Sequence, residues 1–582
     1  MPQIQGPDGR THVIPGVYST TRVRSSLPGP LVEFLVPVIL GQADEGIPFR
    51  WDGSLKQTDE PEQGGFQYLS TDGAVGEAFG PESELRQAMA WAKRHGLPGA
   101  YVGALNALTR ASIEVQSTGP VDEYTLYAKK AGYPSNWIKL QALADGVWEF
   151  TPLKHYTRIL ADKADGVFRI VVRDNSWIRI GATIHVGSNT VDSETAVVLD
   201  KGDVLDSNGQ IEQYIIVDTD ISAVAVTDYA VVFQYDETGK ETITPVDTDT
   251  DSIVDAINQQ SDLFWAVADG SASGSAAISL AGATALIEIS AWGTATAGAS
   301  PALTATDSDA WITWMNQGGF QDFAIRYRQL PRAYFVVSSV ADVHTDFSDY
   351  AIVQRQLDLP ISVTFGTAWG ESAAAIATRT AALDNEDIHL CVGGLDSIAS
   401  YISMAAAVFG RMVEGGNLHN LTSDPLQYAT VEKKWTRTEL KSLHRAGAVA
   451  YRLQLSGAFR FVVSQGLNTL QDNAGPIWNE TTSKTWSIMQ RNIADFVARQ
   501  LADDLYRSEL GDDVVTPNSI STVLIRRADR SLERRGYIVP GSYAIESIAV
   551  NEAGSGYDIE HRYKFPTLSD YLTVRNTIVI GD

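Results

Sequence analysis

The strongest constraint on the fold is a regular alternation of short apolar segments and helix-length segments between residues 311 and 454. The expected strands are residues 333–338, 361–366 and 388–393, and the helix-length segments between them are residues 347–356 and 371–383. This order is typical of a parallel sheet covered by helices. A further helix is expected at residues 401–414, with Met404, Ala405, Val408, Phe409 and Met412 facing the core. The sequence therefore predicts an α/β core layer.

The last part of the chain has a different pattern, typical of an α+β domain. One amphipathic helix is expected at residues 488–510, before Gly511, and a second begins near Asn518 or Ser519 and ends before Gly536. Residues 545–550 and 557–565 alternate as a β-hairpin. The apolar positions of the two helices are Ile493, Phe496, Val497, Leu501 and Leu505 in the first, and Ile520, Val523, Leu524, Ala528 and Leu532 in the second.

Both ends of the chain read as extended arms. Residues 15–24 are β-prone and bounded by Pro and Gly, and residues 571–580 (YLTVRNTIVI) are β-rich. Such strands can complete the exposed sheet edge of a neighbouring subunit, or they can pair within their own subunit. The candidate linking residues are Val17, Tyr18, Thr20, Arg22 and Val23 near the start, and Leu572, Val574, Ile578 and Ile580 near the end.

Several separated segments together resemble the tail sheath proteins of contractile-tailed (myovirus-type) bacteriophages. The segment VIPGVYSTTRV and the following residues 29–46 resemble the family's opening arm and first folded strand. Residues 128–140 (AKKAGYPSNWIKL) resemble an internal Gly-Asn-rich element, and residues 251–298 echo it more weakly. Residues 442–447, 459–463 and 485–510 and the final hairpin follow the order of the family's C-terminal domain.

This resemblance implies a structural role in a virion tail assembled in the host cytoplasm. The implied subunits form stacked rings, hexameric in the family, or an equivalent helix around a tail tube, linked by exchanged terminal strands. On a baseplate signal, the implied sheath contracts and drives the tube through the host envelope for genome delivery. The implied partners are further copies of the chain, the tube protein, and baseplate and tail terminator proteins, with no cofactor and no nucleotide hydrolysis.

Charge is unevenly distributed along the chain. The formal net charge is −26, and residues 186–310 contain 21 Asp and Glu against two Lys and no Arg. We expect a β-rich, solvent-facing insertion there, whose charge disfavours nucleic acid or an anionic membrane as a partner. The single cysteine, Cys391, lies in an apolar strand and is expected to be buried and inert. No apolar run approaches the length of a membrane span, and membrane insertion is not expected.

The alternative of a different class is an α/β enzyme, such as a carbohydrate hydrolase with an acidic accessory domain. The glycine pattern of a dinucleotide fold, GxxxxGK[ST] and GxSxG are all absent. Asp247, Asp249 and Asp251 alternate as in a calcium loop, but Ser252 and Asn258 occupy positions that need Gly and Glu. A helix start capped by Asp251 or Ser252 is the better interpretation. We therefore predict no catalytic, cofactor or metal site.

One basic surface is expected on the second C-terminal helix, at Arg526, Arg527, Arg530, Arg534 and Arg535. These side chains either contact acidic groups on the tube or a neighbouring subunit, or form a solvated face paired locally with Asp529 and Glu533.

The predicted fold class is α/β and α+β multidomain, with extended terminal arms. The expected divisions are an N-terminal arm (1–25), a first sheath domain (26–150), the acidic β-rich insertion (151–310), the α/β core (311–454), a tube-facing α+β domain (455–566) and a C-terminal arm (567–582). A sheath subunit from a cell-encoded contractile injection device fits the same sequence.

Overall fold

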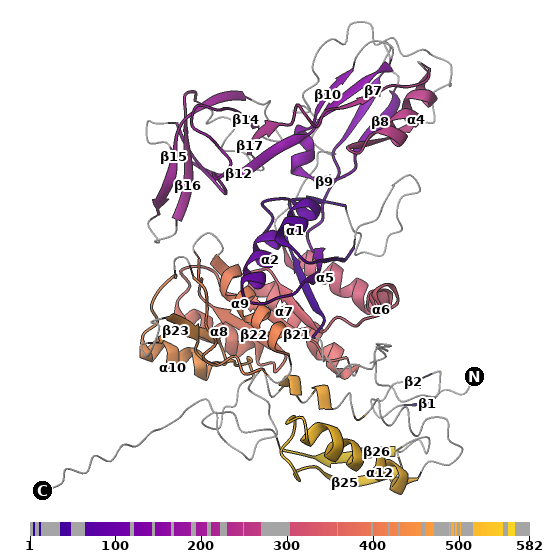
Figure 1. Cartoon of the computed structure of the whole chain (residues 1–582), viewed down its shortest axis with the longest axis vertical. Helices are drawn as coiled ribbons and strands as arrows, with labels where there is room; N and C mark the ends of the chain where they lie inside the picture. The colour runs from indigo at the N-terminus through magenta and orange to yellow at the C-terminus, as the bar shows by residue number, and fades with distance from the viewer. Residues whose placement is uncertain are drawn as a thin grey trace, which may run out of the picture.

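The protein is a mixed α/β multidomain molecule, shown as a computed structural model in Figure 1. The structure describes residues 4–5, 11–12, 35–47, 65–116, 122–142, 146–163, 168–187, 194–206, 211–220, 230–247, 249–268, 303–357, 359–396, 400–416, 419–428, 431–454, 460–470, 488, 491–493, 495–497, 501, 516–550 and 557–564.

The largest unit is an eight-stranded sheet in the order β24-β23-β22-β21-β20-β3-β6-β5. The six inner strands run parallel, and the edge strands β5 and β24 are antiparallel to their neighbours. The strands are β3 (Pro37–Gly41), β5 (Gln67–Leu69), β6 (Ala100–Ala104), β20 (Ala333–Val336), β21 (Ser362–Gly366), β22 (Ile388–Val392), β23 (Val449–Gln454) and β24 (Arg460–Val463).

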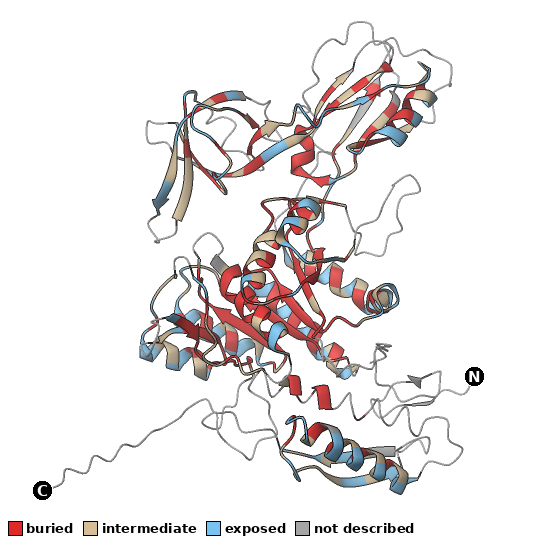
Figure 2. Ribbon diagram, viewed as in Figure 1, coloured by how far each residue is buried: buried red, intermediate tan, exposed pale blue. Residues whose placement is uncertain are grey.

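Helices cover both faces of this sheet, so β20, β21 and β22 at its centre are buried along their whole length (Figure 2). On one face, α2 (Glu84–Arg94) and α9 (Ser400–Gly415) contact each other and the strands β3, β20, β21 and β22. On the other face, α5 (Ala305–Trp314), α7 (Ala341–Gln356), α8 (Ala373–Leu383) and α10 (Arg437–Arg445) form a connected layer. The expected parallel α/β layer is therefore confirmed, and its three predicted strands and three predicted helices match β20, β21, β22, α7, α8 and α9.

The central sheet also joins parts of the chain that the sequence divided into different domains. Strand β3 pairs with β20 in parallel register, with Val38 opposite Tyr334 and Leu40 opposite Val336. The sheet thus unites residues 37–104 with residues 333–463 across the predicted boundaries at 150 and 310. The predicted list of domains itself stays a prediction.

Between β6 and α5, the chain forms two β-rich lobes at the end of the molecule remote from the C-terminal domain (Figure 1). The first lobe is a closed antiparallel barrel in the order β12-β13-β16-β15-β14-β17. Its strands are β12 (Leu153–Lys163), β13 (Arg169–Val172), β14 (Thr183–Gly187), β15 (Glu194–Leu205), β16 (Ile211–Val217) and β17 (Val231–Tyr235).

The second lobe contains two three-stranded sheets and one helix, α4 (Thr250–Gln260). Its strands are β7 (Ser112–Gln116), β8 (Asp122–Ala128), β10 (Lys139–Ala142), β11 (Trp148–Thr151), β18 (Glu241–Ile243) and β19 (Phe264–Ala268). Residues 112–150 therefore share a core with residues 241–268, so the β-rich region begins before residue 150. The helix cap also differs from the expected one. Asp249, not Asp251 or Ser252, caps α4 and accepts a hydrogen bond from the Ser252 N–H at 2.7 Å.

The C-terminal domain has its own apolar core. Helix α12 (Pro517–Arg527) continues into a π-helical segment, η4 (Ala528–Glu533), and both lie against the hairpin of β25 (Ala544–Val550) and β26 (Tyr557–Arg562). The predicted faces are confirmed at Ile520, Leu524, Ala528 and Leu532, which are buried. The helix starts earlier than expected, because Thr516 is the cap and Pro517 occupies the first turn. Two short strands, β1 (Ile4–Gln5) and β2 (Thr11–His12), pair near the chain start.

Helices α2 and α9 approach closely at Gly410. A Cβ built on Gly410 overlaps the Ala92 carbonyl oxygen of α2. We predict that Gly410→Ala lowers the free energy of unfolding by about 1–3 kcal/mol, because the two helices must separate. Urea denaturation measures this change. Gly73→Ala is the matched control, because Gly73 is an exposed residue of α1 (Asp72–Phe79) with nothing within 4 Å of its built Cβ. Gly73→Ala should raise the free energy of unfolding by about 0.5–1 kcal/mol. Equal effects of the two substitutions would contradict the close approach of α2 and α9.

Candidate functional site

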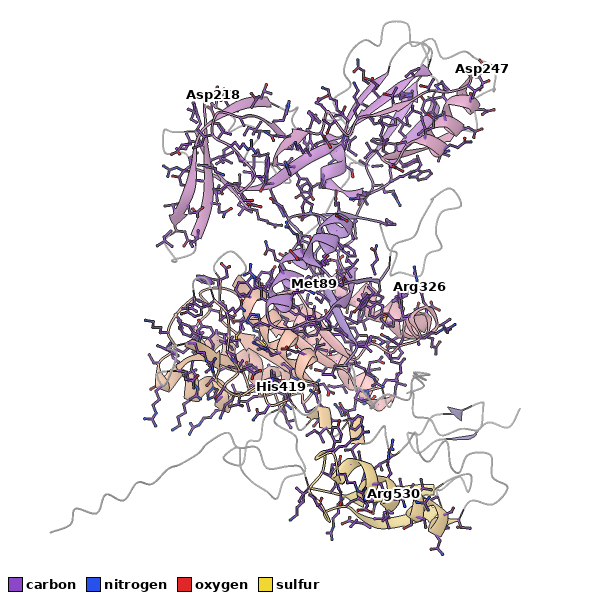
Figure 3. The ribbon with its side chains drawn as sticks, viewed as in Figure 1. Met89, Asp218, Asp247, Arg326, His419 and Arg530 are labelled. Carbon is purple, nitrogen blue, oxygen red and sulfur yellow. The ribbon has the colours of Figure 1, made fainter. Side chains whose placement is uncertain are left out.

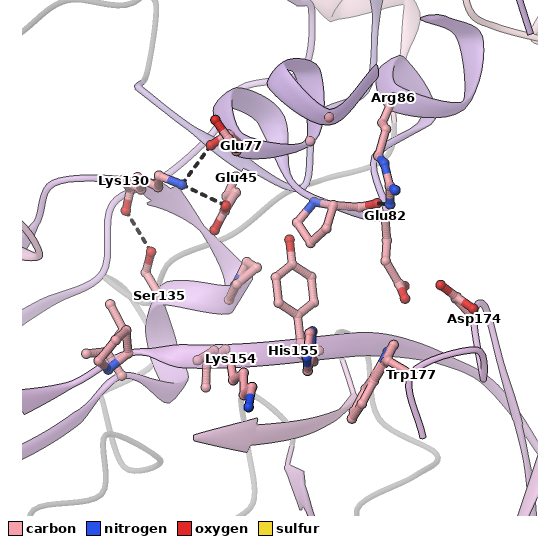
Figure 4. A pocket seen from close by; sticks show the side chains of 18 of the residues that line it. Glu45, Glu77, Glu82, Arg86, Lys130, Ser135, Lys154, His155, Asp174 and Trp177 are labelled. Carbon is pink, nitrogen blue, oxygen red and sulfur yellow. Dashed lines mark hydrogen bonds and ion pairs between the residues drawn. The ribbon is translucent and has the colours of Figure 1, made fainter. Parts of the chain in front are cut away.

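The barrel lobe is joined to the core by a buried polar cluster, here called the junction cluster: Asp44, Glu82, Thr157 and Arg173. Asp44 follows β3 and Glu82 immediately precedes the Ser83 cap of α2, whereas Thr157 is in β12 and Arg173 follows β13. Each side of the junction thus contributes two side chains. Figure 4 shows Glu82 beside the neighbouring crevice, which it helps to line.

Hydrogen bonds connect the two sides of the junction cluster directly. Glu82 Oε2 accepts from Thr157 Oγ1 at 3.0 Å and from the Arg158 N–H at 3.2 Å. The Arg173 guanidinium donates to the Glu82 carbonyl at 3.0 Å and lies 3.6 Å from Asp44 Oδ2. Thr157 Oγ1 in turn accepts from the Asp174 N–H. The contacts are fixed and directional, so they set the orientation of the barrel relative to the core.

Burial dominates the protonation of these groups. Asp44 is 1% exposed and Glu82 5% exposed. Desolvation raises the pKa of Glu82 to about 8, although the Thr157 hydroxyl and Arg173 oppose the change. Burial likewise raises the pKa of Asp44, against the attraction of Arg173. Burial by itself lowers the pKa of Arg173, but the Asp44 carboxylate and the other acidic groups raise it overall, so the arginine stays charged.

Gly80, at the end of α1, allows the two sides to approach. Its φ of 103° is unfavourable for other residues, and a Cβ there would lie 2.8 Å from the Tyr156 hydroxyl and 2.9 Å from Asp44 Cβ. A second connection is made by Lys130, which donates to Glu45 at 3.0 Å and to the Glu77 carbonyl at 2.8 Å. Strands β4 (Glu45–Gly46) and β9 (Ala131–Gly132) pair beside it.

Two crevices lie along this junction. One, of about 630 Å³, is lined by residues of the core and of both lobes, among them Glu77, Arg86, Lys154, His155 and Trp177. In it, His155 stacks on Trp177 with ring centroids 5.4 Å apart (Figure 4). The other, of about 300 Å³, separates Gln87 and Tyr401 of the core from Leu160 and Ile211 of the barrel. We interpret both as gaps between bodies that touch through the junction cluster.

The core is joined to the C-terminal domain by a second charged network. Arg355 of α7 donates to Asp387 Oδ2 at 2.7 Å and makes a second contact with Asp387 Oδ1. Arg491, in the first helix of the C-terminal domain, donates to Glu386 at 2.8 Å and also pairs with Asp495. Arg355 lies 3.5 Å from Asp495. Two arginines thus connect carboxylates from both domains.

The structure describes the predicted basic face. Arg526, Arg530, Arg534 and Arg535 are exposed, and Arg527 is partly buried. They lie opposite the buried side chains of α12 and η4, and Figure 3 shows Arg530 on the C-terminal domain. The nine candidate residues of the terminal arms, from Val17 to Val23 and from Leu572 to Ile580, lie outside the described residues, as does Leu505.

A serine and a histidine do come together, but inside the core. Ser362 Oγ lies 3.4 Å from His389 Nδ1, and the serine also faces Met412 of α9. His389 is 1% exposed, and burial lowers its pKa to about 3. This pair is covered by a helix and cannot reach a substrate. The thiol of Cys391 is fully buried, and burial raises its pKa, as expected for an inert cysteine.

Metal ligands and membrane-spanning helices are further kinds of functional feature. The described residues contain no group of three His, Cys, Asp or Glu side chains that could hold a metal ion. In the same part of the chain, the helices are too short or too polar to cross a membrane. The network around Arg355 and the junction cluster were not found from the sequence, because their members are separated by up to 140 residues.

Comparison with known proteins gives structural matches only. No model of a known protein family matches the sequence. No curated protein matches it either. A sheath tail protein from Listeria innocua is similar in structure, with 13% sequence identity and a TM-score of 0.46, covering 94% of this chain and 96% of that chain.

Two chains from the anti-feeding prophage are similar over a smaller part. A chain of its baseplate has 12% identity and a TM-score of 0.34, covering 49% of this chain and 77% of that chain. A chain of its helical sheath in the contracted state has 12% identity and a TM-score of 0.36, covering 48% of this chain and 77% of that chain.

The junction cluster predicts that the stability of the protein depends on pH through Glu82. The folded pKa of Glu82 lies above its unfolded value, so its contribution to stability is complete below pH 4.5 and is lost as the pH rises through about 8. In Glu82→Gln, the amide oxygen retains both hydrogen bonds without the ionisable group. We expect the free energy of unfolding of the variant, relative to that of the natural protein, to rise by about 2–4 kcal/mol as the pH increases from 4.5 to 8.5. Thermal unfolding at several pH values measures this difference, and a difference independent of pH would contradict the assignment.

Proposed function

We propose that this protein is the structural subunit of a contractile tail sheath. The observation that carries the proposal is the C-terminal hairpin. Within the part of the chain that the structure describes, β25 and β26 form a sheet of only two strands. One face of this hairpin packs on the helices of its own domain, and no other described strand pairs with its outer edges. A two-stranded sheet is marginally stable by itself, and further strands would complete it.

The terminal arms supply the strands for this completion. Residues 15–24 and 571–580 are β-prone segments of suitable length. Added to the β25–β26 hairpin of a neighbouring copy, they would form main-chain hydrogen bonds that do not depend on side-chain fit. Subunits linked in this way form rings or an equivalent helix, with the basic face directed to the tail tube.

The domain junctions support the contractile part of the proposal. The core is a rigid three-layer unit, while its contacts with the barrel and with the C-terminal domain pass through small polar networks. Rigid units joined in this way can change their packing without unfolding, as in hinge-type rearrangements. The strand links would keep neighbours connected while the sheath shortens and drives the tube through the host envelope. The free energy is stored in the extended packing, so the subunit has no catalytic role.

The proposed partners are further copies of the chain, together with the tube, baseplate and tail terminator proteins. The proposed location is the virion tail. The alternative setting for the same subunit is a cell-encoded contractile injection device. The deciding first experiment is electron microscopy of the purified protein over a range of concentration and salt, in which hollow striated tubes are expected. Dispersed protein that hydrolyses carbohydrate would favour the enzyme alternative.

The role of the N-terminal arm is tested by deletion. We predict that removing residues 1–24 leaves a folded monomer that cannot form tubes, because the strand that links neighbours is lost. Electron microscopy measures assembly, and circular dichroism and thermal unfolding verify the fold. Removing only residues 1–13 is the matched control, since it deletes β1 and β2 but keeps residues 15–24. Normal tubes from the longer deletion would refute strand exchange through this arm.

The role of the basic face is tested by charge reversal. Arg530 and Arg534 are exposed, so replacing both with Glu should leave the fold intact. We expect binding to the tube to fall by at least ten-fold at physiological salt, because attraction becomes repulsion. Co-sedimentation with tube protein measures the binding. Arg530→Gln with Arg534→Gln separates loss of attraction from repulsion, and undiminished binding by the Glu variant would mean that this face is only solvated.

A further inference from the structure

A second basic surface lies on the core, outside the C-terminal domain. Residues 433–460 contain seven Lys and Arg and a single acid, Glu439, in a chain whose net charge is −26. This segment includes α10 and strand β23 at one side of the central sheet (Figure 1). A local concentration of positive charge in so acidic a protein requires an explanation beyond solubility.

Helix α10 presents this charge in an ordered row. Leu443 is fully buried against the core, whereas Arg437, Lys441 and Arg445 are exposed and follow one another at intervals of four residues. Side chains at this spacing lie on one face of a helix. The capping box of Thr436 and Glu439 fixes the start of the helix. Within the described residues, these three cations form no ion pair, whereas the neighbouring Lys433 pairs with Glu439 at 3.0 Å.

The complementary surface is helix α4 in the second β-rich lobe. Its inner face, Ile253, Val254, Ala256 and Ile257, is buried. Asp251 and Asp255 are exposed on the outer face, again four residues apart, and Asp247 and Asp262 are exposed just before and just after the helix. No Lys or Arg occurs in the sequence between Lys240 and Arg326. Helix α4 therefore carries a negative row with the same repeat as the positive row of α10.

The two rows cannot meet in one subunit, because α4 and α10 lie in opposite parts of the molecule (Figure 1). We propose that the basic face of α10 docks on the acidic face of α4 of a second copy of this chain. This inference rests on the proposed self-assembly and adds a contact to it. It joins different surfaces of two copies, so it is a head-to-tail contact that can continue from copy to copy.

The strength of this contact follows from its exposure. Exposed ion pairs are individually weak, and salt screens them. Repetition along a polymer makes them effective collectively. A weak contact of this kind steers copies into one relative orientation and can still separate when the subunits rearrange.

Cysteine cross-linking tests the contact directly. Because Cys391 is fully buried, Lys441→Cys and Asp255→Cys each introduce one accessible thiol. The two variants are mixed and oxidised at low salt, both as dispersed protein and after assembly. We expect a disulfide-linked dimer that needs both variants and falls at least five-fold at 0.5 M salt. Asp203→Cys, at an exposed acid of the barrel, is the matched partner and should yield at least ten-fold less dimer with Lys441→Cys. Equal yields, or none under either condition, would overturn the inference.

Charge exchange provides an independent test. Arg437→Glu with Lys441→Glu, and separately Asp251→Lys with Asp255→Lys, should each reduce self-association at least ten-fold in sedimentation. A mixture of the two reversed proteins should recover it. If both reversed proteins lose self-association and their mixture does not recover it, the basic face binds another partner and the inference is overturned. Tubes that form normally from either reversed protein would also overturn it while leaving the sheath function intact. Dimers without any tubes would count against the sheath function alone.

Discussion

The parallel pairing of β3 with β20 is the interaction on which the rest of the structure depends. It places residues 37–41 beside residues 333–336, and the chain between these strands must leave the core and return to it. β6 and the antiparallel edge strand β5 complete the sheet on one side of β3, and β21 to β24 complete it beyond β20. The long excursion that follows β6 forms the two β-rich lobes. A single pairing thus determines that the lobes project from one region of a continuous core.

Burial on both faces explains why this sheet is the rigid unit. Parallel strands need helices on both sides, and the inner strands here are among the most deeply buried segments of the protein. The contacts that join this core to the barrel and to the C-terminal domain are different, because charged and polar side chains make them. Arg173 reaches Asp44 and Glu82 across one, and Arg355 and Arg491 hold Glu386, Asp387 and Asp495 at the other. Directional polar contacts of this type fix an orientation with little apolar area, so they hold neighbouring units in register without merging their cores.

Local patterns in the sequence were sufficient where neighbouring residues determine the structure. The alternation at residues 333–393 predicted β20, β21 and β22 with their helices, and the buried positions Ile520, Leu524 and Leu532 follow from helical spacing. The pairing of β3 with β20 was not predictable in this way, because it joins strands almost 300 residues apart. The junction cluster was not predictable for the same reason, because its members lie far apart in the sequence and each looks like an ordinary polar surface residue there. The cap of α4 is Asp249 and not the expected residue, because the alternating residues Asp247, Asp249 and Asp251 offer several possible caps.

Segregated charge gives a physical reason for the way such a subunit would assemble. Copies that each carry a net charge of −26 repel one another, and uniform repulsion would keep them dispersed. The electrostatic potential is locally positive at the two surfaces where contact is proposed. These are the basic faces of α10 and of the segment from Arg526 to Arg535. Attraction is then confined to a few orientations, and every other approach stays unfavourable. Main-chain strand addition supplies a link that is indifferent to these charges. In the proposed sheath, the charged contacts would therefore select the packing and could be exchanged during contraction, while the strand links would preserve the connection between subunits.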